Sequence, residues 1–452
     1  MDPVIARFVR TRMRATGTPG VAVGVLHRGR ASASGFGITS IAAPAPVDEA
    51  TLFQVGSTGK TFTATAVMKL VEMGELDLDA PVRRYLRDLK LKDPDVAKKV
   101  TLRHLLTHTG GWAGDFFDDT GRGDDALCSV VELLRKVPQL TPLGSTWHYN
   151  NAGFYIAGRV LEKVVGRPYE RVITELLLDP LGMSRSFYFA EEAIVYRVAA
   201  GHIAKGPRST AHEIGQPWAL MRSAGPAGGL ISDVVDQLRW ARFHMGDGRT
   251  PKGARLLKRS TLRQMQRPQA PAGNIADSVG ISWLLSDFDG ARLVSHGGTM
   301  GSGQLSAFVM VPKHDFAVTV LTNSSRGLEV HGPVVHRALD HYLGLKRRLP
   351  QPMSGNGTNV ASYAGRYVDA FKTVAIDLAA KGTRLRAEFV FLKTDEAPRL
   401  APSRFAFFEA DKVIIQGGRL DGSRAEFLRD ERGRVRFMRF GGRLFRKSRA
   451  HS

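Results

Sequence analysis

Ser57 and Lys60 form the only Ser-x-x-Lys motif in the chain, and their types and spacing permit nucleophilic chemistry. Apolar residues recur every three or four positions after Ser57, so a helix is predicted to start near that residue. Residues three apart share one face of a helix, which places the Lys60 amine beside the Ser57 hydroxyl. A serine becomes a nucleophile beside a base or a cation, and a helix N-terminus offers N–H groups to a developing oxyanion. The other interpretation, a helix-capping serine and a solvated lysine, stays open for so short a motif.

Tyr149 and Asn151 lie in the segment TPLGSTWHYNNAGF, at the predicted entry to another helix. A phenol held near an ammonium group loses its proton more readily and can act as a general base. The Asn151 amide can orient a substrate carbonyl or the lysine. A core aromatic side chain followed by an asparagine helix cap explains the same residues without any chemistry.

His296, Gly297, Gly298 and Thr299 end a predicted strand before a further glycine-rich turn. Glycine lets a ligand approach the backbone closely, so this strand edge can offer the Thr299 N–H group as a second oxyanion donor. A plain hairpin turn is the competing interpretation.

The segments around these motifs predict a sheet flanked by helices. Alternating apolar residues over 20–37, with a turn at Arg28-Gly29, predict a hairpin. Residues 77–200 show helical patterns, and residues 291–323 contain three strand-like runs that precede a final helix. The hairpin and the later strands can pair in one antiparallel sheet, with the helical region inserted between them. A cleft between these two lobes is the natural place for a site.

The last hundred residues predict a separate module. Residues 349–362 are rich in Pro, Gly, Ser and Asn, which is typical of a linker. Short alternating runs after them predict a small antiparallel barrel. The Arg-rich end, RVRFMRFGGRLFRKSR, fits barrel strands with an apolar inner face and a basic outer face. An RNA-binding strand platform would need exposed aromatic side chains among the arginines and is less favoured.

The composition is that of a globular chain of two or three domains, with 452 residues, 43% hydrophobic and 24% charged. The single cysteine, Cys128, excludes an intramolecular disulfide framework. The net charge of +21 is spread over the chain, so weak contact with anionic surfaces is allowed for and no nucleic-acid partner is expected. Neither a run of about 18 apolar residues nor a secretory leader is visible. We therefore expect a cytoplasmic protein, or a periplasmic or extracellular one if a leader was removed.

The three motifs occur in an order that resembles the serine β-lactamase and penicillin-binding-protein family. The resemblance is to its class C β-lactamase-related branch, which includes D-aminopeptidases, D-alanyl carboxypeptidases and esterases. It covers nearly all of residues 1–345, in the segments PGVAVGVLHRG, FQVGSTGKTFTA, TLRHLLTHTGG, PLGSTWHYNNAGF, PAGGLISDVVDQLRWARF and SHGGTMG. Residues 360–449 resemble the lipocalin-like barrel that some members carry at the C-terminus.

This resemblance implies that Ser57 is the acylated nucleophile, Lys60 its partner and Tyr149 the base or proton shuttle. Asn151 would contact the substrate amide, and the backbone N–H groups of Ser57 and Thr299 would form the oxyanion hole. No metal or organic cofactor is implied.

The strand edge departs from the family pattern. Efficient β-lactamases of this branch carry Lys-Thr-Gly where this chain has His296-Gly297-Gly298, and Ser-Asp-Asn is also absent. Weak or no β-lactamase activity is therefore expected. His296 would anchor an anionic substrate only when protonated, or with help from an arginine such as Arg222.

The sequence motifs of three other hydrolase classes, namely the Ser-His triad, the nucleophile elbow and the zinc protease, are absent or have a structural explanation. His108 can be read as a triad base, but within the family it belongs to a loop motif, and a structural histidine is preferred. Gly-x-Ser-x-Gly and His-Glu-x-x-His do not occur, which removes the nucleophile-elbow hydrolases and the commonest zinc proteases.

The expected fold is a class C β-lactamase-like two-lobed body, α/β plus all-α, with an antiparallel sheet flanked by helices and a C-terminal lipocalin-like barrel. The hydrolase domain would cover 1–348, with an α/β lobe at about 1–76 and 205–348 and a helical lobe at about 77–204. The linker at 349–362 and the barrel at 363–452 would follow. The expected function is hydrolysis of small ester, amide or peptide substrates through a Ser57 acyl-enzyme, by a chain that can form homo-oligomers. Two alternatives remain, a penicillin-binding protein that deacylates poorly and a non-catalytic polyanion-binding protein on the same scaffold.

Overall fold

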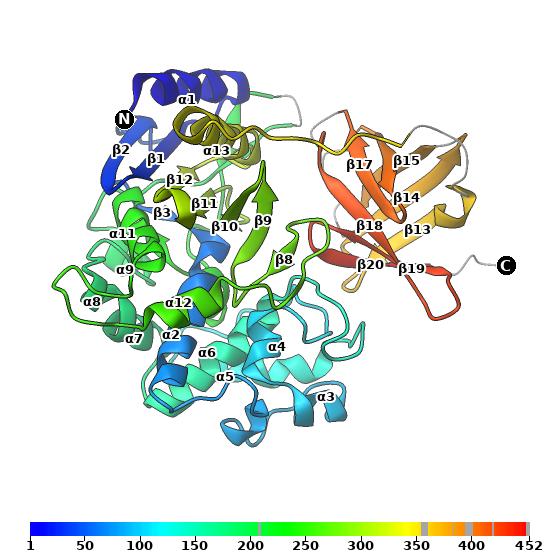
Figure 1. Ribbon diagram of the computed structural model, residues 1–452, viewed down its shortest axis with the longest axis horizontal. Helices are drawn as coiled ribbons and strands as arrows, with labels where there is room; N and C mark the ends of the chain where they lie inside the picture. The colour runs from blue at the N-terminus through cyan, green and yellow to red at the C-terminus, as the bar shows by residue number, and fades with distance from the viewer. Residues whose placement is uncertain (207–208, 354–359, 383, 394–400, 418–419, 449–452) are drawn as a thin grey trace. The chain divides into compact units, whose positions relative to one another are not determined.

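The computed structural model describes residues 1–206, 209–353, 360–382, 384–393, 401–417 and 420–448 (Figure 1). The described chain divides into two compact units. The first unit holds residues 1–145, 150–270 and 279–347, and the second holds 146–149, 271–278 and 348–452. Part of the predicted linker, residues 354–359, lies outside the described residues.

An antiparallel sheet has the strand order β2-β1-β12-β11-β10-β9-β8-β7, and its residues belong to the first unit except for Pro271 of β7 and Ser278 of β8. Its strands are β1 (Gly20–His27), β2 (Arg30–Gly37), β7 (Ala270–Pro271), β8 (Ser278–Val279), β9 (Leu284–Phe288), β10 (Ala291–Thr299), β11 (Leu305–Val311) and β12 (Phe316–Thr322). The N-terminal hairpin joins the later strands through β1, where Val23 pairs with Val320. The predicted pairing of these distant segments is therefore confirmed.

Helices cover both faces of this sheet. The valines at positions 21, 23 and 25 lie in one apolar cluster with residues of α1 (Pro3–Thr16) and α13 (Leu328–Leu343). Figure 1 shows these two helices together above the sheet. Residues of β1 between these valines face α11 (Val234–Met245), whose Leu238 lies 3.1 Å from the position of a Cβ at Gly24. Successive residues of a strand face opposite sides of the sheet, and both sets are buried in β1, so the strand is covered on both faces.

The helical region packs around α2 (Lys60–Glu72) and α6 (Asn151–Val165), which contact each other. The Phe62 ring of α2 also stacks on Trp240 of α11, with ring centroids 3.8 Å apart. The other helices are α3 (Pro94–Lys99), α4 (Leu102–Leu106), α5 (Ala126–Leu133), α7 (Tyr169–Ile173), α8 (Asp179–Leu181), α9 (Ala190–Ala193), α10 (Gly225–Gly228) and α12 (Arg259–Met265). Short two-stranded sheets pair β3 (Phe53–Gln54) with β6 (Ile231–Ser232) and β4 (His202–Ala204) with β5 (His212–Ile214). Among the described residues, no helix combines the length and apolar character needed to cross a membrane.

The second unit contains a closed antiparallel barrel, as predicted. Its eight strands are β13 (Gly365–Asp369), β14 (Val374–Lys381), β15 (Arg384–Phe391), β16 (Ser403–Glu409), β17 (Lys412–Gln416), β18 (Arg424–Arg429), β19 (Val435–Phe440) and β20 (Arg443–Lys447). The apolar side chains of alternate positions form one buried cluster inside the barrel, which includes Phe427, Met438 and Phe445. The two-lobed body and the C-terminal barrel agree with the predicted fold.

Candidate active site

Ser57 lies in a 3-10 turn, Gly56–Gly59, which leads into α2. The α-helix itself starts at Lys60, three residues later than the periodicity predicted. In a 3-10 turn the side chains of residues i and i+3 eclipse each other, so this geometry also aligns Ser57 with Lys60. Between Thr51 and Met68, Ser57 is the only residue that is not buried. The segment therefore exposes a single serine on a buried and tightly packed element.

Lys60 is fully buried, and its amine is directed at the serine. Its Nζ donates a hydrogen bond to Ser57 Oγ over 3.0 Å and another to the backbone carbonyl of Ala227. The Phe154 ring lies 5.5 Å from the ammonium group. A buried ammonium group is costly unless its hydrogen bonds are satisfied, so the Ala227 carbonyl helps to hold the amine beside the serine.

The predicted strand edge runs along the same turn. The position of a Cβ at Gly56 lies 3.0 Å from the Thr299 backbone nitrogen, which brings β10 against the Ser57 turn. Ser306 of the neighbouring strand β11 also contacts the segment that contains Ser57. Its Oγ donates to the Val55 carbonyl over 2.7 Å and lies 3.0 Å from the Thr58 hydroxyl. The backbones of residues 56–57 and 298–299 therefore lie side by side at the site.

Because the strand edge lies so close to the Ser57 turn, we expect two adjacent glycines to differ in whether they tolerate replacement by alanine. A Cβ at Gly298 would overlap the Val55 carbonyl oxygen and lie 2.8 Å from the Ser57 nitrogen. A Cβ at Gly297 would meet only the Ser306 carbonyl, at 3.1 Å, on an exposed residue. We expect Gly298→Ala to lower kcat/KM for p-nitrophenyl acetate by about 10²-fold or more, because a displacement of about 1 Å at a reacting group costs that much.

The matched control is Gly297→Ala, which should stay within about threefold of the parent protein, since its Cβ requires only a small adjustment. Steady-state kinetics and thermal unfolding of both variants provide the measurement. Equal effects of the two substitutions would contradict this account of the strand edge.

His296 is buried, and it stays neutral. Burial together with the nearby positive charge of Lys60 lowers the pKa of His296 to about 3. Its Nδ1 lies 2.8 Å from the Gly297 carbonyl oxygen. The imidazole is therefore uncharged at neutral pH and supplies no cation for an anionic substrate.

Arg222 does not supply a separate cation either. Its guanidinium forms ion pairs with Glu170 and Asp124, at 3.0 and 2.7 Å, and lies over the ring of Phe189. Two carboxylates thus compensate its positive charge within the described structure.

Tyr149 is buried and falls in the second unit, together with the barrel strands. Its backbone N–H donates to the Gly442 carbonyl over 2.8 Å. The Arg443 guanidinium lies 4.5 Å from the centroid of its ring, within the range of a cation–π contact. These contacts, which the sequence did not predict, hold Tyr149 against the turn before β20 within the second unit.

The two asparagines after Tyr149 have different structural roles. Asn150 is the helix cap, since its Oδ1 accepts from the Gly153 N–H group over 2.8 Å. Asn151 begins the helix, and its Nδ2 donates to Asp115 over 2.7 Å. His108 accepts from the Asn150 N–H group through Nδ1 over 3.0 Å, which is the structural role preferred for this histidine.

Sequence reasoning missed three residues that shape the site: Ala227, Ser306 and Asp115. Each acts through a contact between segments far apart in the chain, so local patterns carry no signal for it. The sequence signal for Ala227 is the PAGGLIS segment, which belongs to the stretches that carry the family resemblance. Among the described residues, no group of three His, Cys, Asp or Glu side chains is arranged to hold a metal ion.

Residues 5–341 match the family described as Beta-lactamase. The chain is 35% identical to "Penicillin-binding protein 4" of Amycolatopsis lactamdurans over 356 residues, which cover 77% of this chain and 89% of that protein. It is also 36% identical to "Esterase EstB" of Burkholderia gladioli over 161 residues, or 32% of this chain and 41% of that protein.

Solved structures share the fold. SurE with D-Leu has a TM-score of 0.76 at 24% identity and covers 98% of this chain and 99% of its own. The octameric penicillin-binding protein homologue from Pyrococcus abyssi has a TM-score of 0.68 at 24% identity, with coverage of 98% and 100%. The D-amino acid amidase from Ochrobactrum anthropi SV3 has a TM-score of 0.62 at 23% identity, with coverage of 75% and 98%.

Proposed function

The chain belongs to the beta-lactamase family of serine hydrolases, and from that premise we propose that it cleaves small ester or amide bonds through an acyl group carried by Ser57. The observation that carries the proposal is the pair of the half-buried Ser57, whose Oγ accepts a hydrogen bond, and the buried Lys60 amine that donates it over 3.0 Å. Such a pair is the arrangement that activates a serine nucleophile.

In the proposed reaction, Ser57 Oγ forms a bond to the substrate carbonyl carbon while the Lys60 ammonium group donates to that oxygen and the serine proton passes to Tyr149, the proposed base in its deprotonated form. The backbone N–H groups of Ser57 and Thr299 stabilise the negative charge that develops on the carbonyl oxygen. When the carbon–leaving-group bond breaks, the proton passes to the departing oxygen or nitrogen. Water then attacks the acyl group, releases the acid and returns the proton to Ser57. We propose that Asn151 contacts the substrate amide beside this bond.

The charges at the strand edge support ester and D-amino-acid amide substrates over β-lactams. A β-lactam drug presents a carboxylate, whereas His296 is neutral because its pKa is lowered to about 3. Arg222 is already paired with two carboxylates. The relatives named as an esterase and a D-amino acid amidase support the same substrate classes.

A cavity of about 220 Å³ is lined by both apolar and charged side chains, and the charged ones are Asp119, Arg122, Glu170 and Arg222. Its walls include Gly225 and Gly229, on either side of the Ala227 carbonyl that accepts from Lys60. Its apolar lining consists of Tyr188, Phe189, Trp218, Leu220, Met221 and Ile231. We propose that the acyl group of the substrate occupies this cavity, where the polar side chains can fix its orientation.

A substrate panel tests the proposal. We expect steady turnover of short-chain p-nitrophenyl esters and of D-alanine p-nitroanilide, with slower turnover of L-alanine p-nitroanilide and of nitrocefin. A fluorophosphonate should label Ser57 and stop turnover of every substrate at the same rate. Failure of all four substrates together with an unlabelled Ser57 would reject the hydrolase.

A penicillin-binding protein is the second candidate, because the 35% identical relative carries that name. It would show a burst of one equivalent with labelled penicillin, long trapping of the label and no steady turnover. The same panel with a penicillin trapping assay separates the two functions.

A further inference from the structure

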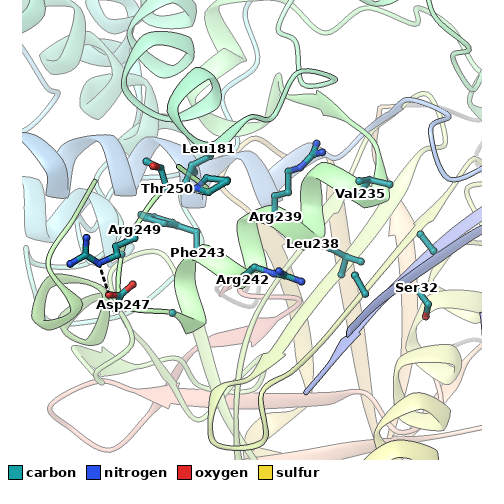
Figure 2. Close-up of a pocket in the computed structure, with 15 residues that line it drawn as sticks. Ser32, Leu181, Val235, Leu238, Arg239, Arg242, Phe243, Asp247, Arg249 and Thr250 are labelled. Carbon is teal, nitrogen blue, oxygen red and sulfur yellow. Dashed lines mark hydrogen bonds and ion pairs between the residues drawn. The ribbon is translucent and has the colours of Figure 1, made fainter. Parts of the chain in front are cut away.

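A second cavity of about 680 Å³ lies between α11 and the edge strand β2 (Figure 2). None of the proposed site residues Ser57, Lys60, His296 and Thr299 lines it. Its volume falls in the range of about 300–1,000 Å³ that is usual for small-molecule sites. The cavity is therefore a candidate binding site apart from the proposed hydrolase site.

The cavity arises from small residues on the edge strand. Ala33 pairs with Gly24, and Ala31 pairs with Leu26, so both alanines share the sheet face that carries α11. Leu238 of α11 packs against Gly24, the inner neighbour of Ala33. Beyond that contact, methyl side chains are too short to fill the space below the helix.

Apolar side chains form the floor of the cavity. Val235, Leu238 and Phe243 come from α11, and Leu181 comes from α8. Figure 2 shows Phe243 between Arg249 on one side and Arg239 and Arg242 on the other, with Leu238 beyond these two arginines, toward Ser32. An occupant gains most from such a floor if it has an extended apolar body.

Three arginines line the cavity: Arg239, Arg242 and Arg249. The first two lie three residues apart and share one face of α11. The Asp236 carboxylate holds Arg239, and the Arg242 Nη2 donates to the Gly29 carbonyl over 3.0 Å. Because a guanidinium has five N–H donors, these contacts orient the groups and leave donors for a ligand.

The lining contains one carboxylate, that of Asp247, which pairs with Arg249 at 3.1 Å and with Arg255 at 3.7 Å. The lining is thus basic on balance, as is the whole chain with its net charge of +21. A second copy of the chain would meet like charges here, so charge complementarity favours an anionic occupant.

From the apolar floor and the arginine pair, we propose that this cavity binds a long-chain monocarboxylate, with its carboxylate at Arg239 and Arg242 and its chain along Phe243 and Leu181. Arginine binds carboxylates through two parallel N–H···O bonds, which a single point charge cannot match. An extended acidic peptide fits less well. Only residues 31–33 of the strand edge line the cavity, and the Val47 N–H group already donates to the Gly37 carbonyl at the other end of β2 over 3.0 Å.

The test measures binding of dodecanoate, below its micelle concentration, to the full chain by titration calorimetry. Two further probes serve for comparison: dodecanol has the long chain without the negative charge, and acetate has the negative charge without the long chain. We expect saturable binding of one dodecanoate at the cavity, with both other probes at least tenfold weaker. Protein labelled at Ser57 with a fluorophosphonate should bind dodecanoate equally well, which separates this cavity from the proposed hydrolase site.

Variants locate the bound molecule. Arg239→Gln combined with Arg242→Gln should weaken dodecanoate binding by tenfold or more, the scale of a lost charged hydrogen bond. Ala31→Phe fills the cavity without changing charge and should also prevent binding. The control is Arg7→Gln on exposed α1, which removes one positive charge elsewhere and should leave the affinity within twofold.

Three results would overturn the proposal: no saturable binding, equal weakening by Arg7→Gln, or tighter binding of an acidic decapeptide than of dodecanoate. Thermal unfolding checks that the arginine variants fold. If they do not, the loss or retention of dodecanoate binding in Ala31→Phe decides whether the ligand occupies this cavity. Ester turnover reports on the hydrolase separately, so failure at this cavity leaves the proposed function standing.

Discussion

Ser57→Ala is expected to lower kcat for p-nitrophenyl acetate by roughly 10⁴–10⁶-fold, the scale seen when a serine nucleophile is removed. The hydroxyl is the atom that would carry the acyl group, so no intermediate can form without it. The remaining rate would come from binding and from the amide N–H groups at the strand edge. Burst kinetics and fluorophosphonate labelling should both disappear with the hydroxyl.

The fold should tolerate this change. Ser57 is half-buried at the surface of its turn, and the substitution removes one hydrogen bond with Lys60. Such a bond contributes about 0.5–3 kcal/mol to stability, so thermal unfolding should show a folded variant. Ser295→Ala is the matched control, because Ser295 is another half-buried serine, on β10 beside His296. Full turnover by the Ser57 variant would remove the proposed function.

Lys60→Met is expected to lower kcat/KM for the same ester by about 10²–10⁴-fold, the usual contribution of a positioned acid–base group. Methionine has a similar length and an unbranched apolar stem, so it can occupy the space of the lysine chain. What disappears is the ammonium group that donates to Ser57 Oγ and to the Ala227 carbonyl. The pH–rate profile should lose the limb that depends on the Lys60 amine, which a purely structural defect would not cause.

Lys69→Met provides the control on the same helix. Lys69 is partly buried, burial lowers its pKa, and its Nζ donates to the Leu176 carbonyl over 3.3 Å. It therefore shares the helix, the partial burial and a carbonyl partner with Lys60, but not the serine. We expect the Lys69 variant to retain activity within about threefold. Similar losses in both variants would mean that Lys60 acts on the fold and not on the reaction.

Much of the architecture could be predicted because local patterns report it directly. The alternation at Val21, Val23 and Val25 marks a strand with a covered face, and the turn at Arg28-Gly29 marks the hairpin. The short alternating runs after residue 363 predict the antiparallel barrel. In each case the period of the apolar residues reflects which side chains face the core, and that information is local.

Boundaries and individual roles were harder to predict. The α-helix begins at Lys60 and not near Ser57, because the first turn is a 3-10 turn that hydrophobic periodicity does not distinguish. Asn150 is the cap of α6, whereas Asn151 bonds to Asp115. The assignment of residues 146–149 to the barrel unit has no local signature, since it depends on contacts with Gly442 and Arg443.

The sequence by itself determined which groups are available for chemistry: one serine and one lysine three residues apart, a tyrosine before two asparagines, and a His-Gly-Gly edge in place of a lysine-bearing one. In a helical turn a spacing of three residues places the serine and the lysine on one face, so their meeting could be predicted from local sequence. Only the tertiary structure decided the charge state of His296, because desolvation and the nearby Lys60 ammonium act through space. It also decided the close packing of Gly298 on the Ser57 turn and the arginine-lined cavity beside β2, since both arise where segments distant in the chain come together.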